Sequence, residues 1–251
     1  FCEGRFSFNS LKIKPQAFSE NINSDSTLFY CKNNNLVGNS DNLNYGTLKS
    51  NFNINIPLNK SSNIIELKAT IGYVNSLNPD IKLTGNIPYW FDKRGINFGN
   101  IDSSFDINRT QLSNLNLFRK NNIRGFLTAK GQLKGKINDP DISIKFNVDY
   151  PNFKGIRIRE IWEGEIKNIN DKFFLNMKNR YSPIPSFLSI KFDSNLKLDN
   201  VSFSRIYNSN KGSIELFKEN NSYIWTANNF PLDELELSIR DNQFDRIKGI
   251  I

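Results

Sequence analysis

Apolar and polar residues alternate along residues 127–148, LTAKGQLKGKINDPDISIKFNV. Up to a break at Asn-Asp-Pro, every second position is small or apolar: Leu127, Ala129, Gly131, Leu133, Gly135 and Ile137. After the break the alternation resumes with Ile142, Ile144, Phe146 and Val148. A period of two residues is typical of β-strands that bury one face. The stretch therefore predicts two long strands, each with one apolar face and one polar face.

The same alternation recurs from residue 51 onwards, in segments such as SNFNINIPL, IIELKATIGYV, IKLTGNI, FLSIKFDSNLKL and GSIELF. Residues 1–50 are less regular: GRFSFNSLKIKP gives one short run, and the Asn/Ser-rich ENINSDS and NNNLVGNSDN predict loops. We therefore expect residues 51–251 to form one continuous, repeat-built β segment. Residues 1–50 are left as an irregular start, or as an edge of the same sheet.

Helical spacing is almost absent, and the best candidates are short pieces at residues 113–118 and 231–237. Parallel α/β folds need crossover helices of a dozen or more residues, so the pattern excludes them. The predicted class is all-β and antiparallel, with strands of up to about ten residues. The apolar face must then be covered by another sheet, by closure of the sheet, by stacking in a solenoid, or by something outside the chain.

Composition limits the kinds of catalytic and metal-binding chemistry that the chain could support. The chain has 33 Lys and Arg against 25 Asp and Glu, no His and two cysteines. The absence of His removes the commonest general base and metal ligand. Cys2 and Cys31 either form a disulfide in an oxidising compartment or remain two thiols. The start at Phe1 and the end in mid-pattern indicate a piece of a longer protein, with no membrane-spanning run of its own.

Three possible functional sites lack the residues, or the arrangement of residues, that they would need. GQLKGK lacks the spacing, the Ser or Thr and the following helix of a phosphate-binding loop. Acids that a hydrolase would need lie at a predicted turn and on outward strand positions: Asp139, Asp141, Glu160, Glu163 and Glu165. The lysines alternate with core positions and do not form a nucleic-acid patch: Lys130, Lys134, Lys136 and Lys145. We predict no enzyme activity, no metal, no cofactor and no nucleic-acid partner.

Several motifs resemble the repeating units of the TamB family, in the AsmA-like group of translocation and assembly module proteins. They are LTGNIPY at residues 83–89, GFLTAKGQLKGKINDPDISIKFNV, GIRIREIWEGEI, WTANNFPLDELELSI and the final IKGII. The family has a glycine-punctuated strand, a Pro-containing turn, a second strand and then a Pro-Leu-x-x-Leu step. The matching residues here are Gly131, Gly135, Pro140, Phe230, Pro231, Leu232, Leu235, Ile247 and Gly249.

The resemblance covers residues 51–251 and is closest to cyanobacterial and chloroplast inner-envelope bridge-type members, as an interior fragment. It implies an elongated curled antiparallel sheet, a β-taco, with an apolar interior. It also implies a periplasmic location in an inner-membrane-anchored protein with an Omp85-type outer-membrane partner. The associated roles are lipid transport between membranes, outer-membrane biogenesis and protein secretion.

Phospholipid acyl chains would then cover the apolar face. The groove-lining residues would be Leu127, Ala129, Gly131, Leu133, Gly135, Ile137, Ile142, Ile144, Phe146 and Val148. The alternative is a structural β-solenoid or β-sandwich module of a secreted or surface adhesin, whose interior its own side chains would fill.

Overall fold

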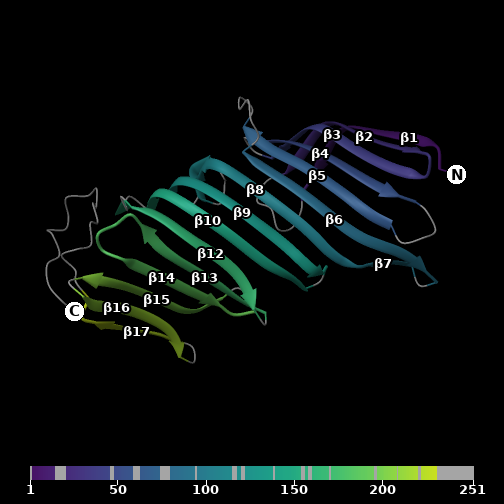
Figure 1. Cartoon of the computed structure of the whole chain (residues 1–251). Helices are drawn as coiled ribbons and strands as arrows, with labels where there is room; N and C mark the ends of the chain where they lie inside the picture. The colour runs from purple at the N-terminus through teal and green to yellow at the C-terminus, as the bar shows by residue number, and fades with distance from the viewer. Residues whose placement is uncertain are drawn as a thin grey trace. The chain divides into compact units, whose positions relative to one another are not determined.

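The computed structural model of the chain is built almost wholly of β-strands (Figure 1). It describes residues 2–14, 21–45, 48–58, 63–73, 80–93, 95–114, 118–119, 122–137, 139–153, 156–157, 160–169, 171–194, 197–207, 209–219 and 222–230. Within these residues, 17 strands belong to one open antiparallel sheet. Helical structure in the same residues is limited to one turn, η1 (Leu112–Asn114), and to residues 118–119. The predicted all-β antiparallel class is confirmed.

The strands follow one another along the chain, with η1 between β8 and β9. Their bounds are β1 (Gly4–Ile13), β2 (Ile22–Lys32), β3 (Asn35–Tyr45), β4 (Leu48–Pro57), β5 (Asn63–Tyr73), β6 (Ile81–Asp92), β7 (Gly95–Phe98), β8 (Asn100–Gln111), β9 (Ile123–Lys136), β10 (Asp139–Phe153), β11 (Ile156–Arg157), β12 (Ile161–Ile169), β13 (Lys172–Arg180), β14 (Ser186–Phe192), β15 (Leu198–Tyr207), β16 (Asn210–Glu219) and β17 (Ser222–Asn228). β9 has 14 residues and β10 has 15, so the longest strands exceed the expected length.

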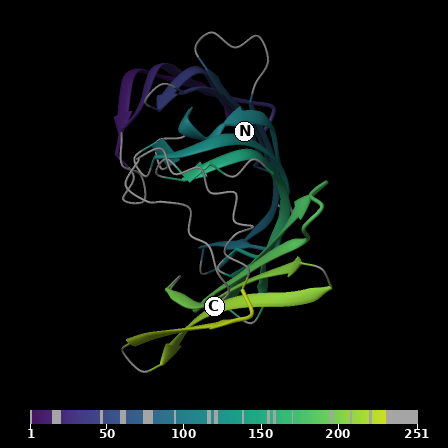
Figure 2. The same ribbon diagram turned by 90° about the vertical axis from the view of Figure 1, so that its left-hand side faces the viewer.

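The chain divides into two compact units. The first unit comprises Phe1–Asn108 and Lys130–Asp141, and the second comprises Arg109–Ala129 and Ile142–Ile251. Within each unit, successive strands pair antiparallel in chain order, as in the series β2–β3–β4–β5–β6 and β12–β13–β14–β15–β16–β17. Figure 2 shows that the strands of each unit are twisted and bent instead of lying in a flat plane, as chiral backbone geometry favours.

The loops predicted in the first fifty residues are wrong, because most of the Asn/Ser-rich stretches lie in β2 and β3. A two-residue turn joins these strands, with Asn33 and Asn34 at φ of 51° and 59°. Asn tolerates positive φ, and such turns match the twist of a hairpin. The Asn-rich composition here supplies a tight turn between strands.

Several buried positions in β2 and β3 carry hydroxyl side chains where apolar ones would be expected. Ser24, Thr27 and Ser40 are 1–2% exposed. Their hydroxyl groups bond to one another: Thr27 donates to Ser24 at 2.9 Å, and the Ser24 and Ser40 oxygens lie 2.9 Å apart. Mutual hydrogen bonding removes the cost of burying them. An apolar pattern search therefore misses these strands.

A disulfide joins Cys2 to Cys31, with the Cα atoms 5.6 Å apart. It ties the residues before β1 to β2, where Gly4 is the register partner of Cys31. This resolves the alternative between a bridge and two thiols.

Tyr89 is the largest fully buried side chain among the described residues and is 2% exposed. Its hydroxyl group donates a hydrogen bond to the carbonyl of Pro57, so a β6 side chain reaches across β5 to the end of β4. Burial raises the pKa of the Tyr89 phenol, partly offset by a side-chain hydrogen bond with Asn63. The folded first unit therefore holds this side chain in its neutral form.

The helix candidate at residues 113–118 overlaps η1 and the helical residues 118–119. The residues between them lie outside the described part. The second candidate, residues 231–237, lies outside the described residues, as do the family motif positions from Pro231 onwards.

Candidate apolar binding face

The predicted lining residues follow the expected alternation in β9 and β10. Five of them lie in β9, where Ala129 and Gly131 are buried, and four lie in β10, where Val148 is buried. The alternate residues Lys130, Gln132, Lys134 and Lys136 are exposed. Ile137 falls in the turn after β9 and is 43% exposed. Of the ten predicted lining residues, the four from Gly131 to Ile137 belong to the first unit and the other six belong to the second.

Strand register in the second unit aligns apolar side chains into two rows that each run across seven strands. The first row is Ile144, Ile166, Leu175, Ile190, Val201, Leu216 and Trp225. The second row is Phe146, Gly164, Met177, Leu188, Phe203, Ile214 and Ala227. Residues that pair directly across antiparallel strands share a face. We call these two rows the apolar face of the second unit.

The apolar face is only partly shielded from solvent. Apart from Trp225 in β17, which is 63% exposed, its members are half-buried. Within the described residues all strands belong to one sheet, so no separate second sheet is available to cover this face. A dry core of this length would bury most such side chains fully.

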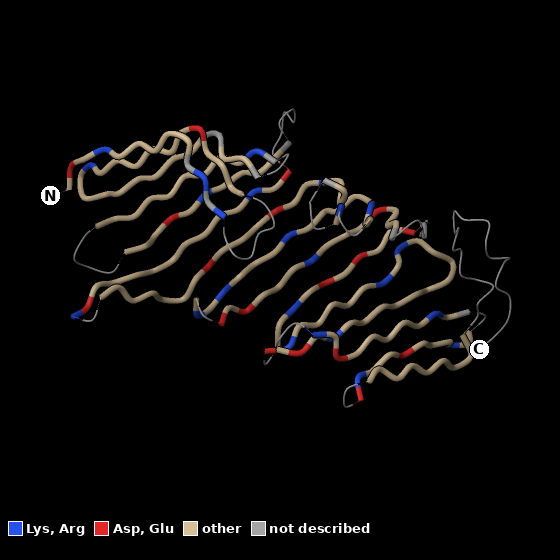
Figure 3. Tube along the Cα trace, turned by 180° about the vertical axis from the view of Figure 1, so that it is seen from behind, with Lys and Arg blue, Asp and Glu red and all other residues tan. Residues whose placement is uncertain are grey.

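The opposite face of the second unit carries a polar row, together with aromatic residues such as Phe174 and Phe217, and we call it the polar face. Lys145, Glu165, Asn176, Ser189, Ser202, Glu215 and Thr226 form the row that alternates with the apolar ones. Ion pairs lie on this side, including Lys178–Glu163 at 3.1 Å and Lys191–Asp199 at 2.7 Å. Figure 3 shows basic and acidic positions interspersed along the strands. The nearby Lys191 ammonium lowers the pKa of the Asp199 carboxyl group.

The first unit has an equivalent pair of rows. One contains Phe29, Gly38, Ile54, Leu67, Gly85 and Ser103, and the other contains Thr27, Ser40, Phe52, Ala69, Leu83 and Phe105. The sequence pattern predicted the apolar positions of β4, β5 and β6. Their alignment is given by the antiparallel register of β4 with β5 and of β5 with β6.

Phenylalanine rings lie over glycines on these faces. A Cβ atom added at Gly131 would overlap the ring of Phe105, and one added at Gly38 would overlap Phe29. In the second unit, a Cβ atom at Gly164 would lie 2.7 Å from Cζ of Phe146. At Gly131 the ring of Phe105 occupies the space that a side chain would need. At Gly135 the backbone itself favours glycine, with φ of 101°.

The Gly131→Ala variant should lower the free energy of unfolding by about 1–3 kcal/mol, because the Phe105 ring must move in a close-packed site. Gly4→Ala is the matched control, since an added Cβ atom there meets no heavy atom within 4 Å. Urea unfolding followed by circular dichroism measures both. Equal midpoints for the two variants would show that the ring and the glycine are not packed together.

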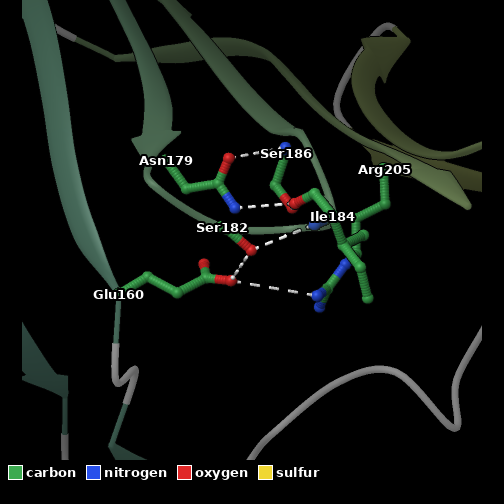
Figure 4. A network of polar contacts seen from close by, with 6 residues as sticks. All are labelled: Glu160, Asn179, Ser182, Ile184, Ser186 and Arg205. Carbon is green, nitrogen blue, oxygen red and sulfur yellow. Dashed lines mark hydrogen bonds and ion pairs between the residues drawn. The ribbon is translucent and has the colours of Figure 1, made fainter.

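The acids considered from the sequence separate in space. Glu163 and Glu165 lie on the polar face and pair with Lys178, Arg180 and Lys167. Asp139 and Asp141 lie at the start of β10 and are exposed. Glu160 differs, because it enters a polar network with Ser182 and Arg205 (Figure 4). Sequence analysis missed Arg205, whose partner is distant in the chain and whose neighbours carry no motif.

Within the described residues, no group of three or more His, Cys, Asp or Glu side chains could hold a metal ion. In the same part of the chain, no helix has the length and apolar character needed to cross a membrane.

No protein family, curated protein or solved structure matches this chain. The resemblance to the TamB family therefore stays a prediction that rests on the motifs quoted above.

Proposed function

We propose that this chain is a bridge segment that carries phospholipid acyl chains on its apolar faces. In this proposal it belongs to a TamB-like, inner-membrane-anchored protein that crosses the periplasm and works with an Omp85-type outer-membrane protein. The curled β-taco form of the sheet is part of the same proposal. Lipid supply to the outer membrane would support protein assembly and secretion there.

The observation that carries the proposal is the half-buried state of the aligned apolar rows. Each apolar side chain left partly in water forgoes roughly 25 cal/mol for every Å² that stays exposed. Rows such as Ile144 to Leu216 repeat that cost on strand after strand. Mobile acyl chains would remove it without a fixed complementary surface.

The disulfide supports the proposed compartment. Cys2–Cys31 joins the only two cysteines in the sequence. Disulfides persist in oxidising compartments, of which the bacterial periplasm is one.

One observation favours the alternative, a structural module with a self-filled interior. Trp162, Phe203 and Phe230 form an aromatic cluster in the second unit, and Phe230 is 0% exposed. Side chains of the chain itself cover the face at this place. A structural module would fill the rest of the face in the same way.

Lipid transfer between vesicles tests the proposal. Donor vesicles carry a fluorescent phospholipid with a quencher, acceptor vesicles carry neither, and the purified full chain is added between them. We expect a transfer rate that rises in proportion to protein concentration. Protein with a β-sheet circular dichroism spectrum that leaves the rate at its spontaneous value would contradict the proposal.

A further inference from the structure

A buried arginine lies at the polar border of the apolar face of the second unit. Beside the second apolar row, the next row holds Trp162 paired with Asn179, and Ser186 paired with Arg205. Arg205 shares its face with Phe203 and Val201, two and four residues earlier in β15. The side chain of Arg205 is 8% exposed. A guanidinium group is thus held at the edge of an apolar surface.

The carboxylate nearest to Arg205 is held by other partners. Glu160 Oε1 accepts a hydrogen bond from the Ser182 hydroxyl group at 2.9 Å, and the backbone N–H of Ile184 donates to the same hydroxyl oxygen (Figure 4). From Glu160 Oε1 to Arg205 Nη2 the distance is 4.0 Å. That separation gives charge attraction but exceeds hydrogen-bond length.

Two buried donors in this place have no acceptor. Arg205 Nε and Trp162 Nε1 are both buried without a hydrogen-bond partner. Both side chains lie in one region of the face: Glu160 contacts Arg205, and Trp162, two positions after Glu160, contacts Phe203, two positions before Arg205. A buried donor without an acceptor destabilises the fold, and a charged donor does so more strongly.

We infer that Arg205 and Trp162 form a binding site for the oxyanion headgroup of an amphiphile, a phosphate or carboxylate attached to an acyl chain. This rests on the proposed function and adds a headgroup site to it. An oxyanion supplies the acceptor atoms that the two donors lack. The chain attached to it would pass the aromatic cluster at Phe203 and lie on the first apolar row at Val201. Glu160, the one carboxylate in the network, would weaken binding by repulsion.

The test uses the ¹⁵N-labelled full chain and three soluble probes below their micelle concentrations. Dodecyl phosphate offers a chain and an oxyanion, dodecyl maltoside offers a chain alone, and inorganic phosphate offers an oxyanion alone. The sequence has three tryptophans, so the indole N–H region of a proton–nitrogen correlation spectrum has few signals, and Trp162→Phe assigns the relevant one. Dodecyl phosphate should move the Trp162 signal downfield, and inorganic phosphate should do so only far more weakly.

Substitutions separate a headgroup site from a structural role. Arg205→Gln should weaken dodecyl phosphate binding by about ten- to a hundredfold, from the loss of charged hydrogen bonds. It should leave dodecyl maltoside binding unchanged, which also shows that the variant is folded. Glu160→Gln should tighten dodecyl phosphate binding, and Arg205→Lys should retain part of it. Arg180→Gln is the control, since Arg180 is a half-exposed partner of Glu163 on the second unit.

The outcomes separate this inference from the proposed function. Equal binding of both amphiphiles, unaffected by Arg205→Gln, overturns the headgroup site and leaves lipid carriage standing. A Trp162 shift with inorganic phosphate as strong as that with dodecyl phosphate overturns the amphiphile assignment. Failure of all three probes overturns both proposals.

Discussion

The Ile144→Asp variant is expected to lose most of its lipid-transfer activity while remaining folded. Ile144 lies at the start of the first apolar row, opposite Ile166. A carboxylate among acyl chains costs several kcal/mol unless it is neutralised or reaches water. Transfer between vesicles, measured at equal protein concentration, should fall towards the spontaneous rate.

The stability of the Ile144→Asp variant distinguishes a half-open face from a dry core. In a dry core, large-to-small changes alone cost about 2–5 kcal/mol, and a buried charge costs more. Mobile lipid or water can refill a half-open face, so the urea midpoint of Ile144→Asp should fall much less. Ser143→Asp is the matched control, one residue away, exposed on the polar face and opposite Lys167. Its transfer rate and midpoint should match the wild type. An Ile144→Asp chain that unfolds, or transfers lipid normally, would contradict the account.

Removal of the disulfide should have the largest effect on the stability of the first unit. Cys2 and Cys31 are 29 residues apart in sequence. Loop-closure entropy for a loop of that length corresponds to about 3–4 kcal/mol. The double variant Cys2→Ser with Cys31→Ser should therefore lose amide protection in β1 and β2, measured by hydrogen exchange.

The second unit serves as an internal reference for that measurement, because the disulfide lies wholly in the first unit. Amides in β13 and β14 should exchange at the same rate in the wild type and the double variant. A reductant should loosen the wild-type β1 and β2 amides and leave those of the double variant unchanged. Unaltered protection of β1 and β2 after loss of the disulfide would show that the sheet pairing alone holds them.

The alternation in the sequence predicts the strands well because side-chain direction in a strand is a local property with period two. Ile142, Ile144 and Phe146 show this, since their burial differs from that of Ser143 and Lys145 as expected. The pattern fails where a face is buried with hydroxyl groups, as at Ser24 and Ser40. Their mutual hydrogen bond depends on a pairing of β2 with β3 that composition does not display.

The candidate headgroup site could not be predicted for a related reason. Three whole strands, β12, β13 and β14, lie between Glu160 and Arg205 in the sequence, and each residue alone looks like an ordinary charged position. The same holds for the packing of Phe105 against Gly131. Contacts made across strands depend on register and curvature, which a linear pattern does not specify.

The most direct test of the central claim compares neighbouring residues of opposite parity in cells. A photo-reactive amino acid is placed in turn at Leu133, Phe146, Lys134 and Lys145 of the chain in its natural, full-length setting. Illumination and mass spectrometry then detect cross-linked phospholipid. The account predicts lipid capture at Leu133 and Phe146, whose side chains lie on the half-buried apolar positions, and none at Lys134 and Lys145, which are exposed on the other face. Equal capture from both parities, or no capture from either, would contradict lipid carriage by the apolar face.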